Sequence, residues 1–231
     1  MSFVYQEGDD VHSIIESKLV KNSNTPPCIK PRGKVCYLFT GQGSQYPGMA
    51  EELYNSHPDV QNTLNSYAKI LSAFNAQNYL SGLVDDDEKI HQTEFTQPAI
   101  VMLQMALTKL WNSTGMTADY LIGHSVGELA ACAAQGTYTE QTTLELVAKR
   151  AELMQATPVD GAMIAIAADR KTLDEIVETL DCVIDYAAFN GPRQTVMSGK
   201  RHTIERIKKH CSAHGIRAKV LTVSHPFHSR L

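Results

Sequence analysis

A serine flanked by glycines, in the segment Gly123–Gly127 (Gly-His-Ser-Val-Gly), constrains the fold of this chain more than any other feature. The short apolar stretch Tyr120–Ile122 precedes it, and the alanine-rich stretch Glu128–Ala134 follows it. This order predicts a strand, a sharp turn with Ser125 at its apex, and a helix. The glycines are expected to permit a strained backbone there, because they carry no Cβ. A hydroxyl at the positive end of a helix is typical of a nucleophile, and an ordinary glycine–serine turn is the alternative.

The composition excludes several classes of protein. The 231 residues are 43% hydrophobic and 20% charged, which predicts a globular chain with one sizeable domain and room for a small insert. A net charge of −4 and the lack of a long basic arm argue against nucleic acid as a partner. No apolar run approaches the ~18 residues of a membrane span, and the polar start leads us to expect no secretory signal. Five scattered cysteines without a C-x-x-C pair predict reduced thiols, a cytoplasmic location and no metal site.

The first part of the chain is expected to lie outside the core. Residues 1–33 are predicted to form an N-terminal extension with a short helix at Val11–Leu19, followed by a linker that contains three prolines. A large α/β domain is predicted over residues 34–159. It begins with a strand at Val35–Thr40, which leads into the glycine-rich loop Gly41–Gln45.

Helical patterns dominate the rest of this predicted domain. Apolar residues recur at three- and four-residue spacing and predict helices at Met49–Ser56, Pro58–Ala73 and Gln97–Ser113. After the serine turn, Thr139 begins a capping sequence for a further helix that runs to about Thr157. The segment Pro158–Gly161 is expected to end that helix.

Strands and helices then alternate in the order β-α-β-β-α-β. The predicted strands are Ala162–Ala167, Cys182–Ala187, Gln194–Ser198 and Arg217–Val223, and the predicted helices are Arg170–Leu180 and Arg201–His214. This order is typical of the ferredoxin-like arrangement. We therefore predict a ferredoxin-like subdomain over residues 160–222, inserted into the large domain, and a histidine-containing loop over residues 223–231 that returns to it.

A serine nucleophile needs a base, and histidine suits this task because its pKa lies near working pH. Six of the nine histidines lie in polar segments or on a basic helix, where exposure to solvent is expected: His12, His57, His91, His202, His210 and His214. His124 adjoins Ser125 but is expected to point elsewhere. His225 and His228 remain, and their spacing does not choose between them.

The same chemistry needs an oxyanion site and a group that holds the substrate. The N–H of Val126, after the serine, and the loop Gly41–Gly43 are candidates for the oxyanion site. A plain turn is the alternative for that loop, and a phosphate loop would need a third glycine and a Lys-Ser/Thr pair. Arg150 borders an apolar helix face and could hold a carboxylate in two hydrogen bonds, although such an arginine is usually on the surface. The adjacent Lys149 is expected to face solvent.

Taken together, the motifs resemble those of a known family. They are, in order, Leu38–Met49, Thr96–Ala99, Gly123–Glu128, Asn190–Pro192 and His225–Ser229. With Arg150 between them, the sequence from Lys34 to Leu231 resembles the malonyl-CoA:acyl-carrier-protein acyltransferases, most closely the acyltransferase domains of modular polyketide synthases. The expected fold is therefore α/β, with an α/β-hydrolase-like large domain and an inserted ferredoxin-like subdomain.

The resemblance implies a role for each candidate residue. Ser125 is implied as nucleophile, His228 as base, and Gln42 and Val126 as oxyanion donors. Arg150 is implied to hold a malonyl carboxylate. Further substrate-binding residues follow from the motifs: Gln97, His124, Asn190 and Phe227. In this family backbone carbonyls orient the histidine, so no third acid is expected.

The implied reaction has two half-reactions. Ser125 attacks the thioester of malonyl-CoA, and the acyl group then moves from the serine to the phosphopantetheine thiol of an acyl carrier protein. Coenzyme A is a substrate here, so neither a cofactor nor a metal is expected, while neighbouring synthase domains are expected partners. Phe227 and Val126 resemble the malonyl type, although Pro226 replaces the usual alanine. Rejection of one extra methyl is worth only about 1–3 kcal/mol.

The chain departs from the family pattern at its end. Family members continue for several dozen residues beyond the histidine loop, so we expect the C-terminal part of the large domain to be missing and the stability to be reduced. This motivates an alternative, a catalytically incomplete fragment that docks a carrier protein or a synthase domain. The basic helix at residues 200–210 could attract an acidic carrier, although a solvated face explains it too. A third reading, hydrolysis, is disfavoured by Arg150 and the full set of motifs.

Overall fold

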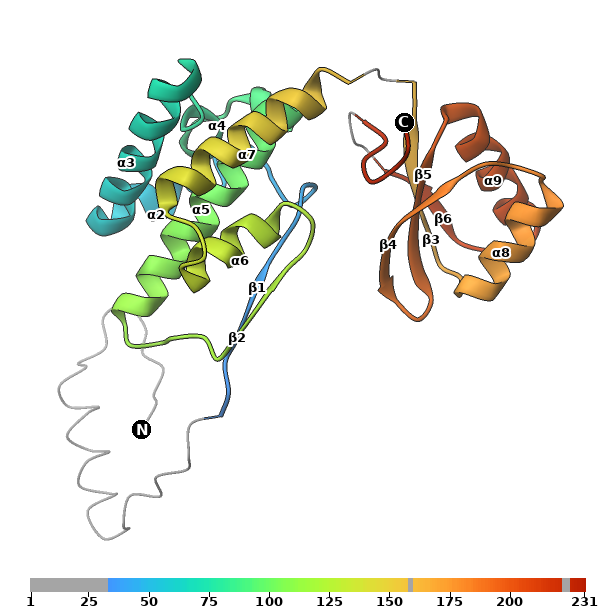
Figure 1. The fold of residues 1–231 in the computed structure, drawn as a ribbon, viewed down its shortest axis with the longest axis horizontal. Helices are drawn as coiled ribbons and strands as arrows, with labels where there is room; N and C mark the ends of the chain where they lie inside the picture. Colours follow the sequence, from blue (N-terminus) through green and yellow to red (C-terminus); the bar gives the residue numbers. More distant parts are fainter. Residues whose placement is uncertain (1–32, 158–159, 222–224) are drawn as a thin grey trace, which may run out of the picture. The chain divides into compact units, whose positions relative to one another are not determined.

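The computed structural model describes residues 33–157, 160–221 and 225–231 (Figure 1). Residue contacts divide the chain into two units, Met1–Lys34 and Val35–Leu231, and all helices and strands discussed below belong to the second. The predicted helix at Val11–Leu19, the proline-rich linker and the end of the last predicted strand at Thr222–Val223 lie outside the described residues. Within the described ranges, no helix combines the length and the apolar character that a membrane crossing requires.

The serine turn follows a strand that belongs to a two-stranded parallel sheet. Strand β1 (Cys36–Phe39) pairs with β2 (Tyr120–Gly123), and Phe39 stands opposite Gly123. Parallel strands end at the same edge of a sheet, so the loop after β1 and the turn after β2 meet there. The backbone N–H of His124 donates to the carbonyl of Phe39 at 2.9 Å, which joins the two strand ends.

The helices of this region match the predicted order. They are α2 (Glu51–Ser56), α3 (Pro58–Asn75), α5 (Thr93–Ser113), α6 (Gly127–Gln135) and α7 (Glu140–Gln155). The predicted cap of α7 is confirmed, because the Thr142 N–H donates to Thr139 Oγ1 at 3.1 Å. The core between these helices includes the fully buried side chains of Leu64, Met102 and Leu144.

Two features of this region differ from the predictions. The short helix α4 (Ser81–Val84) and the 3-10 helix η1 (Glu88–His91) were not predicted, because one turn is too short for a periodic pattern. Helix α5 begins at Thr93, four residues before the predicted Gln97. A polar contact, and not the apolar spacing used for the prediction, stabilises the first turn of α5: the Thr96 hydroxyl donates to the Gln92 carbonyl at 2.9 Å.

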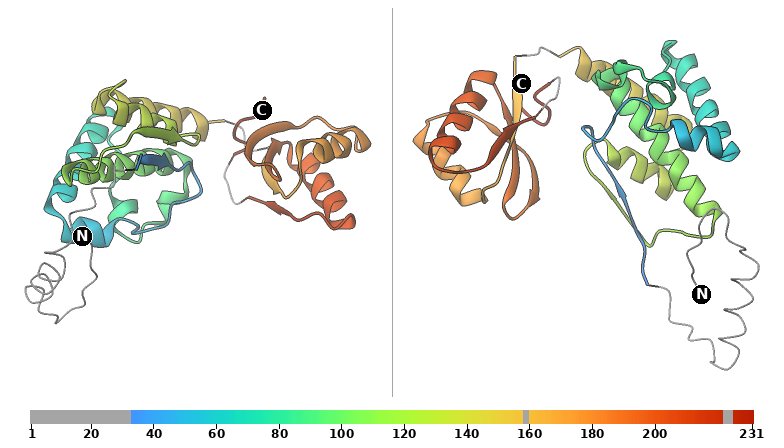
Figure 2. Two further views of the ribbon diagram at one scale, coloured as in Figure 1. Left: turned by 90° about the horizontal axis from the view of Figure 1, so that it is seen from below. Right: turned by 180° about the vertical axis from the view of Figure 1, so that it is seen from behind.

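The second half of the chain forms a four-stranded antiparallel sheet in the order β4-β5-β3-β6. Its elements are β3 (Ala162–Ile166), α8 (Arg170–Thr179), β4 (Asp185–Gly191), β5 (Gln194–Gly199), α9 (Arg201–Ala213) and β6 (Ala218–Val220). Helices α8 and α9 cover one face of the sheet (Figure 2). Ile164 and Met197 from the strands pack there with Leu173 and Ile204 from the helices. Because side chains alternate along a strand, the other face carries a different set of residues.

Strand β4 is displaced from its prediction. Residues Cys182–Ala187 were expected to be the strand, whereas the structure places it at Asp185–Gly191. The residues before it leave helix α8 through Asp181, which has a left-handed φ of 42°, and the Cys182 N–H donates to the Val177 carbonyl at 3.3 Å. Of the three residues before the strand, Cys182 and Ile184 pack into the core between the sheet and its helices, whereas Val183 is exposed. The shift places Asn190 within β4.

Candidate active site

The turn at Ser125 has the predicted strand–turn–helix form. Ser125 has a φ of 54°, in the left-handed region that side chains other than glycine rarely adopt. The Gly127 N–H donates to the His124 carbonyl at 3.0 Å, and the Glu128 N–H donates to the Ser125 carbonyl at 3.1 Å. These hydrogen bonds hold Ser125 in this strained conformation at the start of α6, which is typical of functional sites.

The glycines of this turn act differently from the expectation. The strained φ belongs to Ser125 itself, whereas neither Gly123 nor Gly127 has a left-handed φ. Each glycine instead allows a close approach of backbone to backbone. A Cβ at Gly127 would lie 2.3 Å from the carbonyl oxygen of Phe39, and a Cβ at Gly123 would lie 2.4 Å from Cα of Glu128. The glycines are therefore required for packing α6 against the ends of both strands.

The structure brings His228 to the serine. Nε2 of His228 lies 2.9 Å from Oγ of Ser125, although 103 residues separate them in the chain. His228 also has a left-handed φ, of 55°. His225, the other candidate, is buried, and its ring lies 6.0 Å from that of Phe227.

The surroundings favour the neutral form of His228. Part of the side chain remains exposed, but partial burial of the ring is the main cause that lowers its pKa below the ordinary value. The positive charge of Arg150 and the neighbouring His124 lower it further, while Glu128 opposes them. A neutral imidazole can accept the serine proton, as a general base must.

The glycine-rich loop passes directly beside the serine turn. A Cβ at Gly41 would lie 2.9 Å from the His124 carbonyl oxygen and 3.5 Å from Cβ of Ser125. Gln42 and Val126 line the cavity next to Ser125. Val126 is the residue immediately before α6, and the first two N–H groups of that helix, on Gly127 and Glu128, donate to the carbonyls of His124 and Ser125. This end of the helix also carries partial positive charge, so an anion is favoured there.

Arg150 points into the site and not to the surface. It is half-buried on α7, and its Nη1 donates to Oε1 of Gln97. Gln97 Nε2 in turn donates to Oε1 of Gln42 at 3.2 Å, and Gln42 Nε2 donates to the Thr93 hydroxyl at 3.2 Å. The chain of hydrogen bonds fixes the guanidinium, and burial lowers its pKa from the usual value. Lys149 faces outward as predicted, where it pairs with Glu152 at 2.8 Å.

The residues of the predicted site share one cavity, which has a volume of about 580 Å³. Every predicted site residue lines it: Gln42, Gln97, His124, Ser125, Val126, Arg150, Asn190, Phe227 and His228. The sequence did not identify Glu128 or the apolar lining, which includes Leu129, Met154 and Met163. Two of these could have been found from helical spacing, because Leu129 and Met154 each follow a predicted site residue by four positions. Within the described ranges, no three His, Cys, Asp or Glu side chains converge on a metal-binding geometry.

An ion pair fixes the loop that carries His228. Arg230 donates from its backbone N–H to Asp185 Oδ2 at 2.9 Å and from Nε to Oδ1 at 2.9 Å, and Nη2 also lies 2.6 Å from Oδ1. These hydrogen bonds hold the pKa of the Asp185 carboxyl below its usual range. On the other side of His228, Pro226 packs so closely on Gly161 that a Cβ there would lie 2.4 Å from Pro226 Cγ.

Breaking this ion pair is expected to loosen the histidine loop. In Asp185→Asn the charge-assisted hydrogen bonds from Arg230 weaken, so amide hydrogens of residues 225–231 should exchange faster. Hydrogen exchange followed by mass spectrometry measures this directly. Asp181→Asn removes the same charge at an exposed position nearby and should leave the loop unchanged. Equal exchange in both variants would mean that the loop does not depend on Asp185.

The fold and the site together define a class of protein. A serine in a strand–turn–helix, a histidine at hydrogen-bond distance and an arginine in the same cavity are typical of enzymes that pass an acyl group through a serine ester. The chain belongs to the acyl transferase domain family, which its sequence matches over residues 36–231.

Relatives are found among large synthases. The chain is 36% identical over 200 residues to mycoketide-CoA synthase of Mycobacterium tuberculosis. The matched region covers 86% of this chain and 5% of that protein. It is 36% identical over 216 residues to norsolorinic acid synthase of Dothistroma septosporum, with coverage of 92% and 9%. The chain therefore spans a small fraction of the length of these relatives.

Solved structures agree with this assignment. The acyltransferase domain from the second module of the salinomycin polyketide synthase has a TM-score of 0.79 at 30% identity, covering 98% of this chain and 55% of that chain. The malonyl CoA-acyl carrier protein transacylase from Clostridium perfringens has a TM-score of 0.74 at 30% identity, covering 86% and 63%. The α/β fold is thus shared with an acyltransferase domain of a polyketide synthase and with a malonyl CoA-acyl carrier protein transacylase.

Proposed function

We propose that this chain moves a malonyl-type acyl group from coenzyme A to the phosphopantetheine thiol of an acyl carrier protein, through an acyl-serine intermediate, in polyketide or fatty-acid biosynthesis. The observation that carries the proposal is the 2.9 Å contact between Ser125 Oγ and His228 Nε2, in a cavity that also holds Arg150. The names of the related proteins, which include polyketide synthases and malonyl-CoA transacylases, support the same reaction.

In the first half-reaction, His228 accepts the proton of the Ser125 hydroxyl while Oγ attacks the thioester carbonyl carbon. The backbone N–H groups of Gln42 and Val126 are proposed to stabilise the negative charge that develops on the carbonyl oxygen. The carbon–sulfur bond then breaks, and protonated His228 returns its proton to the departing thiolate. In the second half-reaction, the carrier thiol gives its proton to His228 while its sulfur attacks the carbonyl carbon of the acyl-serine. The bond from that carbon to Oγ then breaks, and protonated His228 returns the proton to Oγ of Ser125.

Arg150 is proposed to hold the carboxylate of the malonyl group. Its hydrogen bond to Gln97 fixes the guanidinium, so little rotamer entropy remains to be lost when a carboxylate binds. Phe227 lines the cavity beside His228 and is proposed to crowd an α-methyl group. The result is a preference for malonyl over methylmalonyl units of about 1–3 kcal/mol.

The proposal extends to the boundaries of the domains and to the location of the chain in the cell. We take residues 34–159 as an α/β-hydrolase-like large domain and residues 160–222 as a ferredoxin-like subdomain, with residues 223–231 as the histidine loop. The antiparallel order β4-β5-β3-β6 and the covering of one face by α8 and α9 support the subdomain. The free thiols in the described ranges, Cys36, Cys132, Cys182 and Cys211, support a cytoplasmic location.

The proposal is tested by following the acyl group. The full chain is incubated with malonyl-CoA, methylmalonyl-CoA or acetyl-CoA, then with a carrier protein bearing phosphopantetheine, and both proteins are weighed intact. We expect a malonyl adduct on the chain and its transfer to the carrier. An adduct that yields only free malonate would identify a hydrolase, and the absence of any adduct on the folded chain would favour a docking module without turnover.

Arg150→Ala is expected to lower kcat/KM for malonyl-CoA about 100-fold and to leave acetyl-CoA nearly unaffected. The loss corresponds to about 3 kcal/mol for a hydrogen-bonded ion pair in a partly buried site. Arg150→Lys keeps the charge but not the planar fork, so it should recover only part of the rate. Stopped assays of acyl-serine formation with both donors measure the selectivity. An equal loss with both donors would mean that Arg150 serves the fold or the base and not the carboxylate.

The pH dependence should report the pKa of His228. Because burial and Arg150 lower this pKa, acylation is expected to decline only as the pH falls below about 6.5, the ordinary value for histidine. With acetyl-CoA as donor, Arg150→Gln should move this acid limb to higher pH, since it removes a charge that lowers the pKa. Glu128→Gln should move it to lower pH, since Glu128 raises the pKa. Lys149→Gln, which removes a charge that faces outward on α7, is the control, and shifts of equal sign in both variants would contradict this account.

A further inference from the structure

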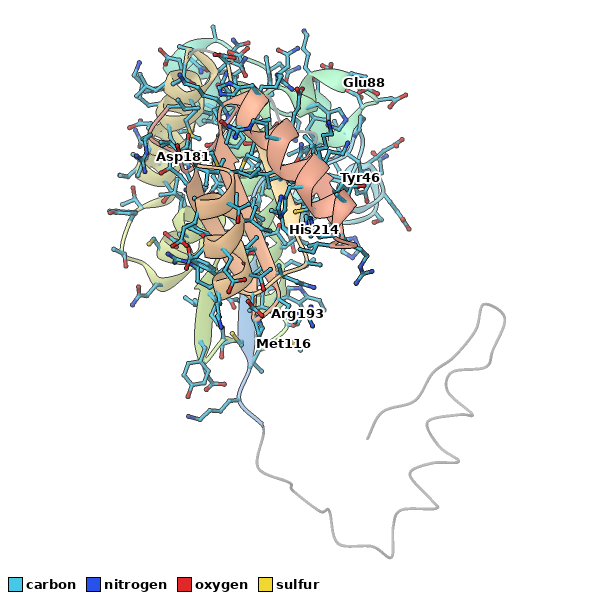
Figure 3. The ribbon with its side chains drawn as sticks, turned by 90° about the vertical axis from the view of Figure 1, so that its right-hand side faces the viewer. Tyr46, Glu88, Met116, Asp181, Arg193 and His214 are labelled. Carbon is cyan, nitrogen blue, oxygen red and sulfur yellow. The ribbon has the colours of Figure 1, made fainter. Side chains whose placement is uncertain are left out.

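The side chain of Gln42 is held at both ends by one face of helix α5. Its Nε2 donates to the Thr93 hydroxyl oxygen at 3.2 Å, and its Oε1 accepts from Gln97 Nε2 at 3.2 Å. Thr93 and Gln97 are both buried, and they share a face of α5 because they lie four positions apart. Figure 3 labels Tyr46, which follows the loop of Gln42, and Glu88, which lies on η1 before α5. Thr93 and Gln97 thus form a clamp on the Gln42 amide.

The direction of the hydrogen bonds in this clamp is dictated by Arg150, because a guanidinium can only donate. Gln97 therefore turns its Oε1 toward Arg150, which leaves its Nε2 for Gln42. Gln42 in turn faces Gln97 with its Oε1, which leaves its own Nε2 for Thr93. The Thr93 hydroxyl oxygen is the acceptor that ends this series. Without it, a partly buried donor of Gln42 would lose its partner, which is costly.

The backbone on either side of Gln42 has little rigidity of its own. Gly41 and Gly43 flank it, and Gly43 has a positive φ of 114°. The Ser44 hydroxyl donates to the Gly41 carbonyl at 3.2 Å. That carbonyl and the Gln42 N–H belong to one planar peptide group, so Ser44 restrains the edge of the peptide that faces away from this N–H. The clamp on the side chain restrains Gln42 from a second direction.

We propose that Thr93 is a positioning residue for the oxyanion site, whose hydroxyl orients the Gln42 side chain and thereby aims the Gln42 N–H at the substrate carbonyl oxygen. The inference rests on the proposed function, which assigns this oxygen to the N–H groups of Gln42 and Val126. An oxyanion donor is effective when it is oriented before the negative charge develops. Thr93 does not line the catalytic cavity, so it acts through Gln42 and not on the substrate.

Thr93→Val tests this role, because valine has nearly the same shape but cannot accept a hydrogen bond from Gln42. Thr93→Ser keeps the hydroxyl. The matched control is Thr143→Val, which removes an equally buried hydroxyl from α7, where it donates to the Thr139 carbonyl at 2.9 Å. Acylation of Ser125 in the full chain is followed by intact mass at increasing concentrations of malonyl-CoA or acetyl-CoA. These series separate the maximal rate from the half-saturating concentration.

Thr93→Val should lower the maximal rate about tenfold with both donors, part of the 10²–10³-fold that removal of an oxyanion donor costs. The half-saturating concentrations should change little, since both thioesters use the same oxyanion site in the transition state. Thr93→Ser should recover most of the rate, and Thr143→Val should react like the wild-type chain. A loss confined to malonyl-CoA would assign Thr93 to the carboxylate site at Arg150. That result would overturn the proposal, as would an unchanged rate.

A double-mutant cycle shows whether Thr93 acts through Gln42. Gln42→Ala removes the clamped side chain and keeps the backbone N–H. In this background Thr93→Val should cause little further loss, because the contact that it breaks is already absent. A variant that merely weakens the fold would lower the rate by the same factor in both backgrounds. Losses that multiply in this way would overturn the positioning role.

Failure of the proposed function is recognised separately, on the wild-type chain. If neither coenzyme A donor acylates Ser125, the proposed function fails. The donor is then p-nitrophenyl acetate, a small ester whose reaction uses no recognition of coenzyme A, and the release of p-nitrophenolate is measured. Thr93→Val should again react about tenfold more slowly than the wild-type chain, for the same loss of orientation. Equal rates with this ester would overturn the role of Thr93, and a wild-type chain inert to the ester would overturn both proposals.

Discussion

Ser125→Ala is expected to abolish the malonyl adduct and the transfer of malonyl to a carrier protein. The reaction passes through a bond to Oγ, and among the described residues that line the cavity Ser125 is the only one with a hydroxyl or thiol group. His228→Ala should retain the nucleophile but slow its acylation by about 10³-fold or more, because removal of a general base costs 10²–10⁴ and the effects within a catalytic unit are not additive. Intact mass and single-turnover rates with malonyl-CoA measure both variants.

The control for these variants is His214→Ala, which removes an exposed histidine on the far side of the sheet, stacked on His210 at 4.1 Å. It should react like the wild-type chain. A malonyl adduct on Ser125→Ala, located by peptide mapping at another residue, would contradict the assignment of the nucleophile. A His228→Ala variant as fast as wild type would mean that Ser125 is activated by another group.

The sequence predicted those parts of the fold that are encoded locally. The strand–turn–helix at Ser125 and the cap of α7 by Thr139 depend on residues within a few positions of each other, and both are confirmed. The order β-α-β-β-α-β followed from alternating periodicities, and the structure shows it. Element boundaries failed where packing overrides the local pattern, as at β4, whose apolar approach Cys182–Ile184 lies before the strand and not in it.

The candidate site was predicted less completely from the residues alone. Spacing could not choose between His225 and His228, because the choice depends on a chain reversal that brings residues 103 positions apart into contact. The direction of Arg150 was equally open, since it depends on Gln97 from a different helix. The resemblance to a family supplied the roles that local chemistry left undecided.

For Gly127→Ala, local helix propensity and the tertiary structure predict opposite changes in stability. Gly127 is the first residue of α6, and alanine favours a helix over glycine by about 1 kcal/mol. From the sequence alone, the substitution would be expected to stabilise the chain or to be neutral. In the structure a Cβ at this position would lie 2.3 Å from the carbonyl oxygen of Phe39 and 2.7 Å from that of Thr40. Both obstacles are backbone atoms, which cannot move aside as the end of a flexible side chain could.

We therefore expect Gly127→Ala to lower the free energy of unfolding by about 3 kcal/mol or more, a large part of the 5–15 kcal/mol typical of a domain. Urea unfolding followed by circular dichroism measures the loss, and Gly33→Ala is the matched control, because no described atom lies within 4 Å of its Cβ position. A Gly127→Ala variant as stable as wild type would mean that α6 can move away from the end of β1. Acylation would then report the consequence, since the same movement would displace Ser125 from the 2.9 Å contact with His228. A stable variant that also keeps its full acylation rate would contradict the close packing described for this turn.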